Sequence, residues 1–274
     1  KFSHTLFSLP FVFVGFFMAT QQSDATLSLR LLLLVVLSVV FARNAAMSFN
    51  RYVDRFMDAS NERTRIRELP RGVIMPRSAL IFSVLNSILF ITTTWFINPL
   101  CFYLSPVALM VILGYSYSKR FTFICHLILG LGLALAPIGA YIAVTAYFSV
   151  APILLSFAVL FWVAGFDIIY SLQDEYFDKA NRLHSVPAKF GRKRALTISS
   201  VLHILTVVLL FLTGRWLDTH WLYYVGACLF SLLLGYQHLI ISVKDISKVN
   251  LAFFVTNGVA AIVYAVVVIV SFFV

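Results

Sequence analysis

Residues 150–178 read VAPILLSFAVLFWVAGFDIIYSLQDEYFD, an apolar run that ends in a series of aspartates. Between 150 and 170 the only charged residue is Asp167. A helix that crosses a bilayer needs about 20 apolar residues. The run is continuous and does not alternate with polar residues, which favours a helix over a barrel strand. The stretch therefore predicts a transmembrane helix whose last turns carry carboxylates.

Eight further apolar runs of similar length surround this one. They lie at about 5–20, 28–47, 76–97, 98–117, 121–147, 194–213, 219–243 and 251–274. Of the 274 residues, 61% are hydrophobic and 12% are charged, whereas a soluble domain has about 25% charged residues. This composition excludes a soluble globular domain, a disordered chain and a disulfide scaffold. It predicts one all-α polytopic membrane domain, 1–274, with about nine transmembrane helices.

The basic residues show which side of the membrane each loop faces. With the N-terminus inside and nine alternating spans, every Lys and Arg except Arg30 and Arg215 lies on the inner side. Such a bias marks the cytoplasmic side. The net charge of +10 is thereby explained without a nucleic-acid partner. The polar loops 48–75 and 171–193 are predicted to face the cytoplasm across a bacterial-type inner membrane.

The inner end of the second predicted span carries a regular series of polar residues. Asn50, Asp54 and Asp58 follow one another at four-residue intervals. Residues four apart share one face of a helix, so these three form a polar stripe. A lone Asp would indicate only solvent-exposed charge. Two carboxylates at this spacing repel each other, so a compensating cation is expected.

The sixth span ends in a second series of the same kind. Asp174 and Asp178 are four apart, Tyr170 is four before Asp174, and Asp167 is seven before it. All four residues are predicted to share one helix face at the inner end. Asp167 lies nearest the apolar centre, where a carboxylate indicates a functional site.

Two carboxylate pairs on one side of the membrane predict a divalent cation. Carboxylate oxygens suit Mg²⁺, which often binds substrate phosphates as well. The predicted metal ligands are Asp54, Asp58, Asp174 and Asp178. Arg and Lys residues follow both pairs, and Arg matches phosphate oxygens in a bidentate manner. The pattern indicates a diphosphate site, whereas no GxxxxGK loop supports a P-loop nucleotide enzyme.

A third polar group ends the fourth span, where Tyr115 and Lys119 are four residues apart. On its own this pair is typical of a helix end, with an interfacial aromatic ring and a snorkelling base. Beside two aspartate series it becomes a candidate contact for diphosphate.

Together these motifs resemble the UbiA superfamily of intramembrane prenyltransferases. That family has an NxxxDxxxD motif followed by RTxxRxLPxG, a YxxxK element, and a DxxYxxxDxxxD motif followed by a Ser-x-x-Ala-x-Phe-Gly element. The matching residues, in the family's order, are Asn50, Asp54, Asp58, Arg63, Thr64, Arg67, Leu69, Pro70, Gly72, Tyr115, Lys119, Asp167, Tyr170, Asp174, Asp178, Ser185, Ala188, Phe190 and Gly191. The similarity extends over nearly the whole chain.

The resemblance implies nine helices around a central cavity under a cytoplasmic cap. It implies an Mg²⁺-dependent enzyme that transfers a polyprenyl group from its diphosphate to a ring carbon of an aromatic hydroxy-acid in quinone synthesis. The first choice of acceptor is 4-hydroxybenzoate. The sequence Arg67-Glu68-Leu69-Pro70 departs from the family's Arg-Pro-Leu-Pro and keeps a hydroxynaphthoate of menaquinone synthesis as the alternative.

The resemblance also suggests a role for each motif residue. Besides the metal ligands, the expected contacts of the donor diphosphate are Asn50, Arg63, Arg67, Tyr115 and Lys119. Asp167 and Tyr170 lie deeper than the metal pair, so they are the candidate catalytic residues at the acceptor ring. Arg43, one to two turns before Asn50, is the candidate for the acceptor carboxylate, with a snorkelling helix-end Arg as the alternative.

Two other classes of membrane protein are alternatives to this interpretation. A transporter should carry polar residues near the middle of several spans, whereas only Asp167 lies deep here. Membrane alcohol-phosphate transferases resemble one another in a single compact Asp/Gly/Arg motif, and this chain has two separated aspartate motifs. Both alternatives therefore fit less well than prenyl transfer.

Overall fold

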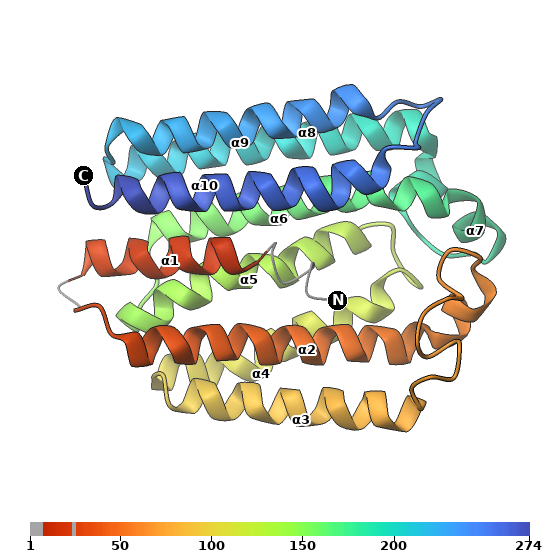
Figure 1. The fold of residues 1–274 in the computed structure, drawn as a ribbon, viewed down its shortest axis with the longest axis horizontal. Helices are drawn as coiled ribbons and strands as arrows, with labels where there is room; N and C mark the ends of the chain where they lie inside the picture. The colour runs from red at the N-terminus through yellow and green to blue at the C-terminus, as the bar shows by residue number, and fades with distance from the viewer. Residues whose placement is uncertain (1–7, 24–25) are drawn as a thin grey trace.

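The computed structural model describes residues 8–23 and 26–274, and within these ranges the chain is helical and contains no β-strand. The helices run nearly parallel to one another in a single bundle (Figure 1). They are α1 (Leu9–Gln22), α2 (Leu29–Ser60), α3 (Pro76–Trp95), α4 (Pro99–Ser118), α5 (Cys125–Thr145), α6 (Val150–Ser171), α7 (Glu175–Ala180), α8 (Val186–Leu217), α9 (Trp221–Ile240) and α10 (Asn257–Ser271). A 3₁₀ turn, Leu172–Asp174, joins α6 to α7, and a π-helix, Leu251–Thr256, leads into α10.

The predicted class, a polytopic all-α membrane protein, is confirmed. Within the described residues, eight helices are long and apolar enough to cross a membrane, and α1 is a shorter apolar helix of 14 residues. The predicted span at 5–20 corresponds to α1, and its first residues, 5–7, lie outside the described ranges. The predicted division between the third and fourth spans is also present. Asn98 caps α4 there by accepting a hydrogen bond from the backbone N–H of Cys101 at 2.8 Å.

Two helices, α2 and α8, extend well beyond their apolar runs. Helix α2 continues to Ser60, so the first aspartate motif is fully helical. The α6 helix reaches Ser171, and α7 carries the chain on to Ala180. Helix α8 begins at Val186, earlier than the predicted residue 194, because its polar first turns precede a kink at Gly191. The positive φ of Gly191, 76°, is a conformation that glycine adopts without a steric cost.

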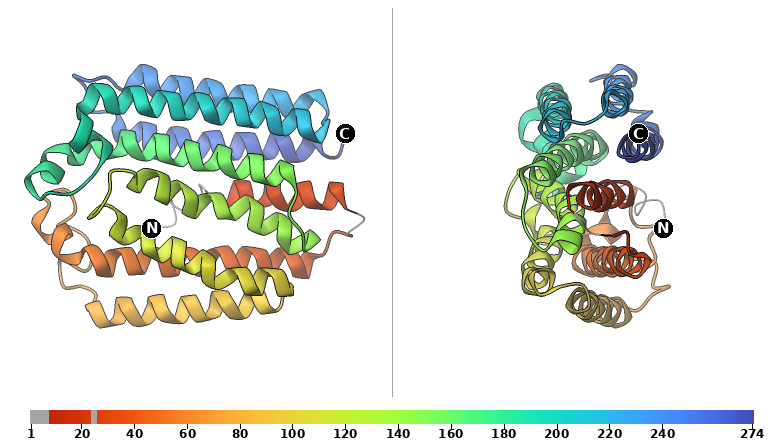
Figure 2. Two further views of the ribbon diagram at one scale, coloured as in Figure 1. Left: turned by 180° about the vertical axis from the view of Figure 1, so that it is seen from behind. Right: turned by 90° about the vertical axis from the view of Figure 1, so that its left-hand side faces the viewer.

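Contacts between helices follow a simple order. The α6 helix packs between α5 and α8, α2 pairs with α3, α9 pairs with α10, and α1 contacts both α5 and α10. Figure 2 shows this arrangement along the helix axes, with α1 placed between α10 and α2. Polar side chains help to join α2 to α3, since Ser83 donates to the carbonyl of Ala45 at 2.9 Å. Hydrogen bonds of this type are worth about 0.6 kcal/mol on average between membrane helices.

An aromatic cluster forms the core where α1, α6, α9 and α10 meet. The ring of Trp162 lies 5.1 Å from that of Phe11 and 5.5 Å from that of Phe230, measured between centroids. The indole N–H of Trp162 donates to Oδ1 of Asn257 at 2.9 Å, so its one polar group is satisfied inside the bundle. This cluster supports α6, the helix that carries the second aspartate motif.

One end of the bundle is covered by two segments that are far apart in the sequence. The loop that follows α2 and the short helix α7 lie side by side at this end, and the C-terminus lies at the opposite end (Figure 1). Asn61 and Arg63 of the loop both donate hydrogen bonds to Asp174, which directly precedes α7. The two polar segments therefore form a joint cap over the same end of the bundle.

The orientation of this cap can be tested by cysteine labelling. In a variant without the three natural cysteines, Glu62→Cys and Asn181→Cys place thiols in the cap, and Tyr147→Cys places one in the α5–α6 loop. All three positions are exposed. Because basic residues favour the cytoplasmic side, we expect an impermeant maleimide added to intact cells to label only Tyr147→Cys. Labelling of Glu62→Cys and Asn181→Cys from opposite sides would contradict the topology.

Candidate active site

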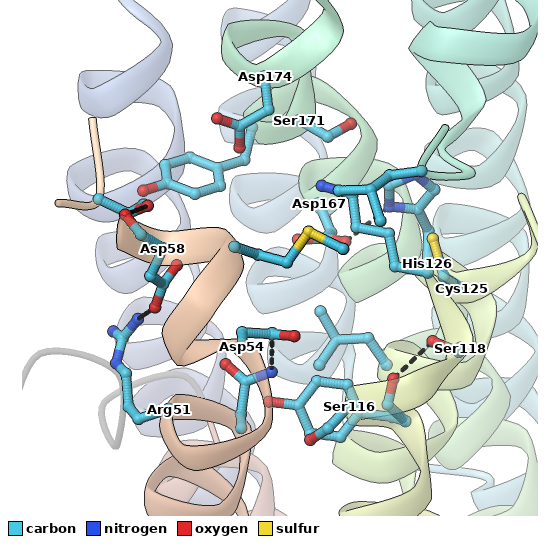
Figure 3. Close-up of a pocket in the computed structure, with 18 of the residues that line it drawn as sticks. Arg51, Asp54, Asp58, Ser116, Ser118, Cys125, His126, Asp167, Ser171 and Asp174 are labelled. Atoms are coloured by element: carbon cyan, nitrogen blue, oxygen red, sulfur yellow. Dashed lines mark hydrogen bonds and ion pairs between the residues drawn. The ribbon is translucent and has the colours of Figure 1, made fainter. Parts of the chain in front are cut away.

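The two aspartate motifs line one cavity of about 300 Å³ beneath the cap. Asp54 and Asp58 reach it from α2, whereas Asp167 and Asp174 reach it from α6 and the turn that follows (Figure 3). The predicted residues Asn50, Arg63, Arg67, Tyr115, Lys119, Tyr170 and Arg43 also line this cavity. The structure thus brings together every predicted site residue except Asp178, which does not line the cavity.

On the α2 side, a side-chain amide binds Asp54 and an arginine binds Asp58. Asn50 Nδ2 donates to Asp54 Oδ2 at 2.9 Å, as expected for residues four apart on one helix face. Arg67 Nη1 donates to Asp58 Oδ1 at 2.6 Å, whereas the nearest atom of Arg51 lies 3.8 Å from Asp58 Oδ2. Within the described ranges, that buried Oδ2 atom has no hydrogen-bond partner. One oxygen of Asp58 therefore remains available for another ligand.

On the α6 side, Asp174 is bound by Arg63 in a bidentate manner. Arg63 Nε donates to Oδ1 at 3.0 Å, and Arg63 Nη2 donates to Oδ2 at 2.5 Å. The remaining nitrogen, Nη1, donates to the hydroxyl of Tyr170 at 2.9 Å. Burial acts to lower the pKa of Arg63, but its bonds to Asp174 outweigh burial and raise that pKa above its usual value. The guanidinium therefore stays charged at any physiological pH.

Asp178 lies behind the cavity wall and is fully buried. Lys119 Nζ lies 2.8 Å from its Oδ1 atom, and Ser185 donates to its Oδ2 atom at 2.8 Å. Burial lowers the pKa of Lys119, and the charge of Asp178 more than offsets this, so the pKa of Lys119 is raised. Lys119, which lines the cavity, is therefore a permanent cation oriented by Asp178. A metal-binding role for Asp178 requires Lys119 to move away, and it stays a prediction.

Deeper in the cavity, two ring systems accompany the candidate catalytic residues. The carboxylate of Asp167 lies 2.6 Å from Nδ1 of His126, which comes from α5 (Figure 3). The ring of Tyr170 lies 4.1 Å from that of Phe253, and their planes are inclined by 30°. Phe253 belongs to the π-helix before α10, a local irregularity often found at functional sites.

A second, apolar cavity of about 330 Å³ lies among α2, α3, α4 and α5. It shares Arg43, Tyr115, Leu129 and Leu133 with the polar cavity, so the two are adjacent. The Nε atom of Arg43 is buried and has no hydrogen-bond partner among residues 8–23 and 26–274. An unpaired guanidinium N–H in such a place is costly unless a ligand accepts its hydrogen bond.

Among the cavity-lining residues that the sequence did not predict are Arg51, Asn61, Arg120, His126 and Phe253. Arg51 and Arg120 directly follow the motif residues Asn50 and Lys119, so proximity to the motifs was a usable signal. His126 and Phe253 lie in segments that match no motif. Their positions in the cavity depend on which helices pack against one another in the folded chain.

The carboxylates of the cavity are candidate ligands of a metal ion. In the part of the chain that the structure describes, no three His, Cys, Asp or Glu side chains are close enough to hold a metal ion by themselves. However, the unpaired oxygen of Asp58 and the cavity-lining carboxylates of Asp54 and Asp174 are the hard oxygen ligands that suit Mg²⁺. Such donors fit a cation that is shared with substrate phosphates, as is common for Mg²⁺.

Comparison with known proteins defines the class of this chain. Residues 8–259 match the model of the UbiA prenyltransferase family, so the chain belongs to this family of intramembrane prenyl-transferring enzymes. The resemblance predicted from the motifs is thereby confirmed. The 4-hydroxybenzoate octaprenyltransferase of Photobacterium profundum is 31% identical over 243 residues, which cover 88% of this chain and 84% of that protein. The enzyme of the same name from Aeromonas hydrophila is 32% identical, and the alignment covers 90% of this chain and 86% of that protein.

Solved structures show the same fold. A UbiA homolog from Aeropyrum pernix in its apo form superposes with a TM-score of 0.89 at 29% identity, and the alignment covers 98% of both chains. A UbiA homolog from Archaeoglobus fulgidus bound to DMAPP and Mg²⁺ has a TM-score of 0.66 at 23% identity and covers 95% of this chain and 96% of its own. The second similarity concerns the fold alone.

Proposed function

We propose that this enzyme transfers a polyprenyl group from its diphosphate to a ring carbon of an aromatic hydroxy-acid, with 4-hydroxybenzoate as the first choice. The observation that carries the proposal is the junction of two cavities. A charged cavity under the cap adjoins an apolar cavity within the bundle, and Arg43 and Tyr115 line both. This arrangement matches a substrate with a charged head and a long apolar chain. The names of the relatives support the aromatic acceptor.

The donor diphosphate is proposed to lie between α2, α4 and α6. Asp54, Asp58 and Asp174 would hold Mg²⁺ there together with the diphosphate, and the bound cation would neutralise charge on the departing diphosphate. A protein of the same fold, the Archaeoglobus fulgidus homolog, has been solved with DMAPP and Mg²⁺ bound, which supports these two kinds of ligand. Arg63, Arg67 and Lys119 reach the same cavity and supply charge-assisted hydrogen bonds to phosphate oxygens.

Binding of diphosphate would also change the partners of the ion pairs in the site. Arg63 and Arg67 now bind carboxylates, and each has to exchange at least part of that pairing when a phosphate anion and a cation enter together. The carboxylates would then bind the cation, and the guanidinium groups would bind the phosphate oxygens. Such an exchange preserves charge balance in a poorly solvated site, where an unpaired charge is expensive.

The acceptor is proposed to bind deeper, beside Asp167 and Tyr170. Its carboxylate would pair with Arg43, whose buried Nε atom supports this role because it has no partner among the described residues. The electron-rich ring attacks the allylic carbon as the bond to diphosphate breaks. The apolar walls, among them Val163 and Phe166, exclude water from the reacting carbon. Asp167 is the proposed acceptor of the ring proton.

A hydroxynaphthoate stays the second candidate because of the Arg67-Glu68-Leu69-Pro70 sequence. The location proposed for the reaction is the cytoplasmic face of a bacterial-type inner membrane. The basic residues of the cap support that location, since they gather at the end of the bundle that holds the charged cavity.

The choice of acceptor can be tested with membranes that contain the enzyme. We expect prenylated 4-hydroxybenzoate to form when the membranes receive a polyprenyl diphosphate, Mg²⁺ and 4-hydroxybenzoate, and mass spectrometry identifies the product. Arg43→Ala should raise the KM for the acid by about tenfold, since a hydrogen bond to a charged group is worth about 1.5–3 kcal/mol. Arg55→Ala is the matched control, because Arg55 is on the same helix and does not line the cavity.

The same assay separates the alternatives. Prenylated hydroxynaphthoate without prenylated 4-hydroxybenzoate would replace the first choice by the second and would leave the donor chemistry intact. An enzyme that prenylates no aromatic acid would contradict the proposed function. If Arg43→Ala and Arg55→Ala behaved alike, Arg43 would not be the ligand of the acceptor carboxylate.

A further inference from the structure

His126 occupies a position that no motif of the sequence explains. It is the second residue of α5, it is 3% exposed, and it lines the charged cavity. Its Nδ1 atom lies 2.6 Å from Oδ2 of Asp167, and its Nε2 atom accepts a hydrogen bond from the backbone N–H of Val186 at 3.2 Å. Both ring nitrogens therefore have partners inside the protein.

These two partners determine where the proton of the ring lies. A backbone N–H can only donate, so Nε2 must be the unprotonated nitrogen that accepts from Val186. In a neutral imidazole the other nitrogen then carries the proton, so Nδ1–H donates to the carboxylate of Asp167. A protonated ring would place an Nε2–H against the N–H of Val186. The hydrogen bond from Val186 thus favours an imidazole with an unprotonated Nε2 and the proton on Nδ1.

The contact with Val186 links the imidazole to a rigid part of the fold. Val186 is the first residue of α8, whose early N–H groups have no partner within the helix. The preceding residue, Ser185, caps α8 and donates to Asp178, which in turn orients Lys119. The start of α8 is therefore connected to Asp167 through His126 and to Lys119 through Asp178.

We propose that His126 is a positioning residue that holds the carboxylate of Asp167 toward the acceptor ring. This inference rests on the proposed function, in which Asp167 removes the ring proton. The ring carbon forms a bond to the allylic carbon while the carbon–oxygen bond to diphosphate breaks. The proton of the attacked carbon then moves to Asp167, the electrons of that C–H bond restore the aromatic ring, and the proton is released to water. His126 orients the carboxylate and takes no proton itself.

Two substitutions of His126 test the role of the neutral imidazole. His126→Leu removes both hydrogen bonds and keeps a side chain of similar size. We expect kcat to fall by about tenfold or more. This loss is part of the 10²–10⁴-fold rate increase that a positioned general base contributes. The KM for the polyprenyl diphosphate should change by less than about twofold, because ground-state binding of the donor is untouched. His126→Gln offers an amide donor and a carbonyl acceptor without a titratable group. It should recover most of the lost kcat.

His203→Leu is the matched control for the loss of a buried imidazole. His203 is also 3% exposed, and it bonds to His238 at 2.8 Å and to the carbonyl of Trp162 at 3.3 Å, away from the charged cavity. Its replacement should lower the unfolding temperature in detergent without the selective loss of kcat. A double variant with Asp167→Asn completes the design. If His126 acts through Asp167, His126→Leu should reduce the remaining activity of Asp167→Asn by less than about twofold, because residues that act as a unit are not additive.

The results for these variants either support or overturn the positioning role of His126. Unchanged kcat in His126→Leu would overturn the positioning role, and so would a full further loss in the Asp167→Asn background. Equal damage by Leu and Gln would show that His126 works as an acid or base and not as a neutral bridge. A wild-type enzyme that prenylates no aromatic acid would instead remove the proposed function, and this inference with it.

Discussion

Asp174→Asn is expected to reduce prenyl transfer by about 10²-fold or more, the size of effect seen when a main electrostatic stabiliser of a transition state is removed. The substitution keeps the size of the side chain and removes the charge that would hold Mg²⁺ with the diphosphate. It also removes the carboxylate to which Arg63 donates two hydrogen bonds, of 3.0 and 2.5 Å. Asp54→Asn on the opposite wall should have a similar effect. Initial rates at saturating donor, measured over a range of Mg²⁺ concentrations, provide the comparison.

Glu175→Gln is the matched control for this experiment. Glu175 is the next residue along the chain, is 6% exposed, and is paired with Lys179 at 2.7 Å and with Arg192 at 2.8 Å. It does not line the cavity. The control should lower stability and leave the Mg²⁺ dependence of the rate unchanged. A chelator should abolish wild-type activity, and added Mg²⁺ should restore it; Asp174→Asn enzyme with wild-type rates would refute the metal assignment.

The second large effect is expected at the bases of the cavity. Arg67→Ala and Lys119→Ala should each raise the KM for the polyprenyl diphosphate by about 10- to 100-fold, since a hydrogen bond to a charged group contributes about 1.5–3 kcal/mol. Arg71→Ala and Lys193→Ala are the controls, because both residues are exposed and neither lines the cavity. Equal small effects at all four positions would mean that these bases act only through their combined field.

Lys119→Ala should have an additional consequence for stability. It leaves the fully buried Asp178 without the cation at 2.8 Å. Breaking a fully buried ion pair costs about 3–5 kcal/mol, and the loss here should be smaller because the Lys119 side chain is 36% exposed. A double variant, Lys119→Ala with Asp178→Asn, should regain much of the unfolding temperature because the unpaired charge is gone. Its affinity for the donor should stay low. Donor binding restored along with stability would assign Lys119 a structural role only.

Much of the architecture could be predicted from the sequence because it follows from local properties. The apolar runs and the distribution of basic residues predicted the helices and their alternation, since both depend only on the cost of placing charge in a bilayer. Four-residue spacing placed Asn50 beside Asp54, and the structure has their side chains 2.9 Å apart. The sequence did not predict the exact extent of α8, because polar first turns and a kink at Gly191 precede its apolar part.

The partners of the charged residues, in contrast, were decided only by the tertiary structure. The bonds between Arg63 and Asp174 join positions 111 residues apart, and His126 meets Asp167 across two packed helices. Spacing along one helix shows which residues share a face, yet it cannot show which neighbouring helix that face meets. For the same reason the sequence placed Asp178 with the other aspartates, whereas packing against Ser185 and Lys119 withdraws it from the cavity. Helix packing therefore determines which carboxylates are available to a ligand and which serve to orient a base.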